Sequence, residues 1–149
     1  MSLPGFSLAL PGQVLFGRGR ASEAAGLILE HGRSGLLVRG RSVAFADMLA
    51  AELRSAGAQV TEETGQGEPT LPQIETALAA LRGQQIDVVV AVGGGSVIDF
   101  AKALAALIPC AGAPLDYLEG VGGGKPLDRA SLPMIALPTT AGTGAEVTK

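Results

Sequence analysis

Aromatic residues, cysteine and histidine are scarce in this sequence. Its 149 residues include no tryptophan, one tyrosine, one cysteine and one histidine. A lone cysteine, Cys110, excludes an internal disulfide and suits a reducing cytoplasm, where we expect the protein to reside. The lone histidine, His31, has no histidine or cysteine partner for a metal site. We instead expect it to end a helix just before Gly32, where a cationic side chain is favoured.

Long apolar runs and an excess of positive charge are also missing. No stretch of 18 uncharged apolar residues is present, so the sequence predicts no membrane-spanning helix. The first ten residues contain no basic cluster and do not resemble a secretory signal. Eleven basic residues against fourteen acidic ones give a net charge of −3. They form no basic stripe, which argues against a nucleic-acid partner.

Short apolar runs instead alternate with amphipathic segments along the whole chain. The predicted strands are 6–10, 13–16, 35–38, 59–61, 88–92 and 132–137. The predicted helices are 22–30, 43–56, 72–82 and 96–108. This order predicts one α/β domain over residues 1–149, with a Rossmann-like, mainly parallel sheet and helices on both faces.

The most informative stretch is DVVVAVGGGSVIDFAKALAALI at residues 87–108. An uncharged β-branched run at 88–92 predicts a strand buried on both faces. A glycine turn follows, and Ser96 with Asp99 forms an S-x-x-D pair typical of a helix start. Unpaired N–H groups and the helix dipole at such a start suit a phosphate. The alternative is a plain strand-to-helix turn without a ligand.

A second stretch ends the chain with LPMIALPTTAGTGAEVTK. Its apolar run at 132–137 predicts another buried strand, followed directly by a loop rich in threonine and glycine. Ligands of open parallel sheets bind outside the carboxyl ends of the strands, so both loops are expected at one edge. Thr139 and Thr140 then either bond a ligand or cap the next element.

Together the two stretches resemble the iron-containing (group III) alcohol dehydrogenase family. GGGSVIDFAKA at 93–103 is similar to its pyrophosphate-loop motif, and PTTAGTGAEVT at 138–148 to its second cofactor-contacting motif. The resemblance implies NAD or NADP binding. The implied cofactor contacts are Gly93, Gly94, Gly95, Ser96, Val97, Asp99, Thr139, Thr140, Gly142 and Thr143, with Gly40 and Leu118 from elsewhere in the chain. Asp99 could instead serve only as the helix cap.

Three further positions are compared with the family. Gly40, between Arg39 and Arg41, stands where the family often has an acid that holds the ribose of NAD. A glycine leaves room for a 2′-phosphate and arginines can pair with it, which favours NADP; alternatively both arginines are solvated and NAD is accepted equally. Leu118 belongs to a segment similar to one that the family places over the cofactor. Glu68 replaces a frequent asparagine, which puts its role in doubt.

For activity, the resemblance implies hydride transfer between an alcohol or aldehyde and the nicotinamide. A divalent metal, iron or zinc, would be bound by one Asp and three His of a helical C-terminal domain that this chain lacks. We therefore expect a cofactor-binding portion that is inactive alone. The alternatives are a maleylacetate reductase or glycerol (phosphate) dehydrogenase of the same superfamily, or a standalone non-catalytic nucleotide-binding module. A homodimer through the N-terminal strand region is also implied.

Two other glycine-rich segments fail as motifs. Gly17-Arg18-Gly19 begins a G-x-G-x-x-G pattern, but Ser22 stands at the third glycine. Residues 122–126 suggest a P-loop, yet Pro126 replaces the hydroxyl residue that would meet magnesium. We expect a tight turn and a surface loop, respectively.

Overall fold

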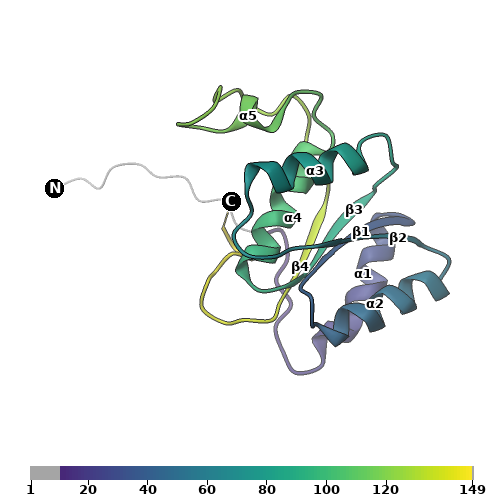
Figure 1. Ribbon diagram of the computed structural model, residues 1–149. Helices are drawn as coiled ribbons and strands as arrows, with labels where there is room; N and C mark the ends of the chain where they lie inside the picture. Colours follow the sequence, from purple (N-terminus) through teal and green to yellow (C-terminus); the bar gives the residue numbers. More distant parts are fainter. Residues whose placement is uncertain (1–10, 149) are drawn as a thin grey trace.

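The computed structural model describes residues 11–148 (Figure 1). Four parallel strands form one sheet in the order β2-β1-β3-β4. The strands are β1 (Ser34–Arg39), β2 (Gln59–Thr64), β3 (Val88–Gly93) and β4 (Met134–Pro138). The helices are η1 (Arg20–Glu23, a 3₁₀ turn), α1 (Ala24–His31), α2 (Ala44–Ser55), α3 (Leu71–Leu81), α4 (Gly95–Leu107) and α5 (Pro114–Tyr117). The predicted α/β architecture is therefore confirmed.

Helices cover both faces of the sheet. On one face α1 and α2 pack against side chains such as Leu37 and Val90. On the other, α3 and α4 pack against Leu36 and Val89, the alternate residues of the same strands. Figure 1 shows these two helix pairs on opposite sides of the strands. Every residue of β3 is buried, as its β-branched, uncharged sequence predicts. None of the described helices is both long and apolar enough to cross a bilayer.

The two predicted N-terminal strands, unlike the other predicted strands, are not part of the described sheet. Residues 6–10 lie outside the described part of the chain. Residues 13–16 form no strand, so that prediction is wrong. Val14 and Phe16 are 69% and 98% exposed, because no described strand lies beside this segment to pair with it. The apolar residues at 14–16 thus gave a strand signal that the described sheet does not use.

Other boundaries shift by a few residues. β2 continues to Thr64 rather than ending near residue 61, because its pairing with β1 continues to the end of both strands, where Arg39 opposes Thr64. The predicted helix at 22–30 begins as the 3₁₀ turn η1 and continues as α1, which ends at His31 as expected.

Replacing Gly93 by alanine should destabilise the fold. A Cβ atom at Gly93 would lie 2.7 Å from the Cβ of Val97, which is closer than real contacts allow. We expect Gly93→Ala to lower the free energy of unfolding by about 1–3 kcal/mol in urea titration, the usual cost of overpacking. The double variant Gly93→Ala, Val97→Ala should lose less than the sum of the two single losses, since each change makes room for the other.

The matched control is Gly26→Ala in α1, where nothing lies within 4 Å of an added Cβ. It should stabilise the protein by about 0.5–1 kcal/mol, because alanine favours a helix over glycine. A Gly93→Ala variant as stable as the parent would show that the turn can move away from Val97.

Candidate functional site

The chain changes direction across the sheet between β1 and β3. From β1 it passes through α2 to β2 on one face, and from β3 it passes through α4 to β4 on the other. Open parallel sheets bind ligands outside the carboxyl ends of the strands at such a switch point. Here Gly40 follows β1 and donates its N–H to the Val92 carbonyl at 3.1 Å, while the glycine turn follows β3. The topology therefore singles out this edge as the candidate site.

The first turn of α4 approaches this edge very closely. A Cβ at Gly93, Gly65 or Gly40 would come within 2.7, 3.2 or 4.0 Å of an atom of Val97. These three glycines lie at the carboxyl ends of β3, β2 and β1. The Val97 side chain is 7% exposed and is buried among them. Val97 thus packs beneath the glycine turn and fixes how close α4 lies to the strands. The sequence alone did not predict that Gly65 takes part in this contact.

The two resembling motifs meet at the glycine turn. A Cβ at Gly94 would lie 3.6 Å from Thr140 Oγ1, and one at Gly95 would lie 3.1 Å from Thr143 Oγ1. The Thr139 N–H donates to the Gly93 carbonyl at 2.9 Å, which extends the pairing of β3 with β4. The predicted meeting of the two loops at one edge is therefore what the structure shows.

The far end of the threonine loop is fastened to α4. Ala145 is buried in the core, and Lys102 Nζ donates to Thr148 Oγ1 at 2.7 Å. Residues 139–148 form bends and turns and begin no helix, so the capping role considered for Thr139 and Thr140 is wrong. Gly142 has a φ of +122°, a conformation that a glycine adopts without strain.

The predicted S-x-x-D cap is also wrong. The helix starts at Gly95 with Gly94 as its N-cap, and no side chain caps it among the described residues. Ser96 therefore lies inside the first turn, where its hydroxyl donates to Glu68 Oε1 at 3.3 Å. Asp99 accepts a hydrogen bond from Lys102 Nζ at 3.4 Å instead. In the first turn the Val97 N–H donates to the Gly94 carbonyl at 3.1 Å, whereas the N–H groups of Gly95 and Ser96 lie where a helix start provides no intrahelical acceptor. The helix dipole adds positive potential there.

The two arginines beside Gly40 have different surroundings. The Arg39 guanidinium lies between the carboxylates of Asp47 and Glu62, and its side chain is 13% exposed. The hydrogen bond to Asp47 raises the pKa of Arg39. Arg41 is exposed and donates to the neutral amide oxygen of Gln66. The expectation that both arginines face a ligand phosphate is not met for Arg39, because a carboxylate of α2 and a carboxylate of β2 already neutralise it.

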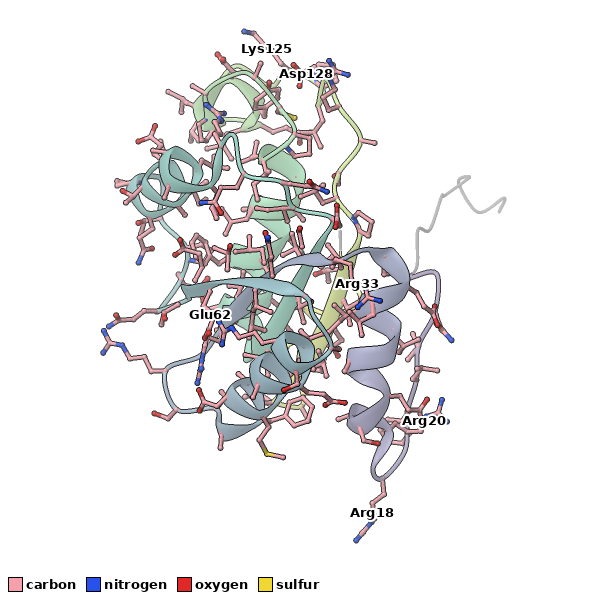
Figure 2. The ribbon with its side chains drawn as sticks, turned by 90° about the vertical axis from the view of Figure 1, so that its right-hand side faces the viewer. Arg18, Arg20, Arg33, Glu62, Lys125 and Asp128 are labelled. Carbon is pink, nitrogen blue, oxygen red and sulfur yellow. The ribbon has the colours of Figure 1, made fainter. Side chains whose placement is uncertain are left out.

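Leu118 lies apart from the other candidate contacts. It caps α5 and lines an apolar hollow between α3, α4 and α5, together with Ile74, Leu107 and Tyr117. Figure 1 shows α5 beyond α3, at the top end of the molecule, with the yellow loop that follows β4 lower in the view. Lys125 and Asp128 of the same segment are labelled at that end in Figure 2. The structure does not bring Leu118 to the glycine turn.

A nucleotide fits this edge better than a metal does. Over residues 11–148, no group of three or more His, Cys, Asp or Glu side chains could hold a metal ion. By contrast, Gly94 and Gly95 are only partly buried and have no side chains, and the hydroxyls of Thr140 and Thr143 lie beside them. Unpaired N–H groups next to hydroxyls at a helix start suit a phosphate group.

Comparison with known proteins identifies the family of this chain. The family model for iron-containing alcohol dehydrogenases matches residues 11–149. Long-chain-alcohol dehydrogenase 1 of Geobacillus thermodenitrificans is 40% identical over 107 residues, which are 71% of this chain and 27% of that protein. A mitochondrial hydroxyacid-oxoacid transhydrogenase of Caenorhabditis elegans is 45% identical over 83 residues, 54% of this chain and 18% of that protein.

A solved structure is similar over nearly the whole chain. It is a sulfoacetaldehyde reductase from Bifidobacterium kashiwanohense in complex with NAD+, with a TM-score of 0.80 and 30% identity. The match covers 97% of this chain but 39% of that one. This chain therefore spans well under half the length of the relatives that it matches.

The ion pairs of Glu62 should make stability depend on pH. Figure 2 labels Glu62, which lies on the outer strand β2. Arg54 donates to its carboxylate at 2.8 Å and Arg39 at 3.3 Å, and these bonds hold its pKa below the usual 4.5. A lowered pKa stabilises the fold above the unfolded-state value, and the effect is lost as pH falls through the folded-state value. Glu62→Gln should therefore cost about 0.5 kcal/mol at pH 7 and nothing at low pH.

Urea titrations of parent and variant from pH 7 to pH 2 measure this difference. Glu63→Gln is the control, since it makes the same charge change on the same strand and no described ion pair includes Glu63. A gap between parent and Glu62→Gln that stays constant with pH would contradict the assigned cause.

Proposed function

The chain belongs to the iron-containing alcohol dehydrogenase family, and from this membership we propose that it forms the nicotinamide-dinucleotide-binding part of an oxidoreductase. The observation that carries the proposal is the turn at Gly94 and Gly95, which lies at the start of α4 beside Thr140 and Thr143. A phosphate group there accepts hydrogen bonds from N–H and hydroxyl donors without meeting a Cβ atom.

Different residues of this edge would contribute different interactions to a bound pyrophosphate. Gly95 and Ser96 offer backbone N–H groups, and the α4 dipole adds positive potential. Thr140 and Thr143 offer hydroxyls from the opposite side of the turn. Gly93 and Val97 act from beneath by setting how close α4 lies to the strands. Asp99, whose side chain is 45% exposed, is available to polar groups of a ligand despite its contact with Lys102.

The bound cofactor would supply the hydride chemistry, whereas the residues of this chain bind and orient it. A relative of known structure is in complex with NAD+, which supports a nicotinamide dinucleotide as the ligand. We propose that the complete protein transfers hydride between an alcohol and an aldehyde. Since the described residues offer no metal-binding group, any divalent metal would need ligands from outside them.

Assembly of two copies through the N-terminal region belongs to the same proposal. Val14 and Phe16 are 69% and 98% exposed, an unusual position for two apolar side chains so close together in sequence. Their burial against a second copy would remove this apolar surface from water.

We also propose a modest preference for NADP over NAD, now resting on Gly40 and Arg41. Gly40 presents no side chain at the end of β1, while the exposed Arg41 guanidinium contacts only the neutral amide of Gln66 among the described residues. One exposed arginine paired with a 2′-phosphate contributes about 1 kcal/mol or less. Arg39 adds nothing, because Asp47 and Glu62 hold it.

Gly95→Val tests the cofactor site. The valine Cβ would lie 3.1 Å from Thr143 Oγ1 and would cover the backbone that the pyrophosphate approaches. We expect calorimetry with NADH to show a loss of more than about tenfold in affinity, as hydrogen bonds to a charged group are removed. Circular dichroism and thermal melting would verify that the variant folds. The control is Gly12→Val, where nothing lies within 4 Å of an added Cβ. Unchanged NADH affinity in Gly95→Val would refute the site.

The cofactor preference has its own test. We expect the parent to bind NADPH about fivefold more tightly than NADH at low salt, which corresponds to about 1 kcal/mol. Gly40→Asp should reverse this preference, because the new carboxylate repels a 2′-phosphate and accepts hydrogen bonds from the ribose. Arg41→Gln should abolish it. Arg18→Gln is the control, since Figure 2 shows Arg18 pointing away from the rest of the molecule. Equal affinities in the parent would disprove the preference.

A further inference from the structure

One carboxylate lies against the start of α4. Glu68 is part of the loop that follows β2, and its Oε1 accepts a hydrogen bond from Ser96 Oγ at 3.3 Å. Ser96 belongs to the first turn of the helix, the proposed pyrophosphate position. No other described side-chain hydrogen bond joins an acidic residue to Gly94, Gly95 or Ser96. Glu68 is therefore the described carboxylate that is hydrogen-bonded at the position proposed for the bound anion.

The N-terminal end of α4 favours the binding of one negatively charged group. The N-terminal end of a helix stabilises negative charge, and the N-cap Gly94 has no side chain to supply it. Glu68 supplies such a charge from a neighbouring loop. The Ser96 hydroxyl, however, carries one proton and can donate it either to Glu68 or to a phosphate oxygen. A carboxylate and a pyrophosphate thus compete for the same hydroxyl and for the same end of the dipole.

We propose that Glu68 takes the place of the ligand anion in the empty protein, and that it thereby lowers the affinity for every ligand that carries a pyrophosphate. The inference rests on the proposed function and concerns the same site. Glu68 is exposed, so its side chain can turn into solvent when an anion binds. The competition is set by phosphate charge and is independent of whether a 2′-phosphate is present.

The test compares Glu68→Gln with the parent by calorimetry at low salt, with NADH, NADPH and ADP as ligands. Glutamine keeps the shape and an oxygen acceptor but removes the charge. We expect all three ligands to bind about three- to tenfold more tightly to the variant, as for removal of a like charge near the protein surface. High salt should shrink this gain, because exposed charges are screened. Adenosine, followed by ligand-observed NMR, should bind both proteins equally.

Glu75→Gln is the matched control. Glu75 is exposed on α3, and its replacement changes the net charge by the same amount away from α4's first turn. It should leave all affinities unchanged. Thermal melting without ligand would verify that both variants fold.

Several outcomes would overturn the inference. NADH affinity that is equal in Glu68→Gln and parent would show that the carboxylate does not compete, and weaker affinity would show that it holds the ligand. If adenosine gained as much affinity as NADH in Glu68→Gln, the effect of the Glu68 carboxylate would not depend on the phosphates of the ligand. If NADH and ADP bind the parent without a gain in the variant, this inference fails alone. If neither ligand binds either protein, the proposed function fails and this inference fails with it.

Discussion

The site depends on how closely the first turn of α4 approaches the sheet. Val97 packs against the ends of β3, β2 and β1 because Gly93, Gly65 and Gly40 have no side chains there. A larger residue at Gly93 or Gly65 would push the helix start outward, because a Cβ atom there would lie 2.7 or 3.2 Å from Val97. The glycine turn, its threonine neighbours and the helix dipole all reach their positions through this contact. The same close contact between α4 and the strand ends therefore determines both the packing beneath the turn and the position of the ligand site above it. The residues that make this contact are distant in sequence.

Much of the architecture could be predicted from the sequence because burial leaves clear patterns. The run at 88–92 became a strand buried on both faces, and the amphipathic segment at 43–56 became α2. The prediction failed where the same local sequence pattern is compatible with more than one structure. The apolar residues at 14–16 lack a pairing partner among the described strands, and such a partner is not visible in local sequence. Ser96 and Asp99 match a capping pattern, yet the N-cap of the helix is Gly94, two residues before the position that the pattern requires.

The site was predictable to the extent that its parts lie in motifs. Both loops were expected at one sheet edge, and the structure brings Thr140 and Thr143 to the glycine turn. The surroundings of Arg39 could not be predicted, because the carboxylates that neutralise it come from a helix and a neighbouring strand. Leu118 was placed by resemblance alone, and packing of α5 against α3 takes it elsewhere. Long-range packing and charge partners thus account for most of what the sequence left undetermined.

The parallel register of the sheet has a consequence for how this chain folds. Gly35 pairs with Val88, and Val89 pairs with Met134, so each of these ladders joins segments far apart in sequence. No two described strands form a hairpin, and every pairing needs a crossover. A chain dominated by distant contacts loses entropy before it gains pairing energy, which slows folding. Until these distant pairings form, the uncharged β3 segment has no strand beside it, and exposed unpaired strands favour aggregation.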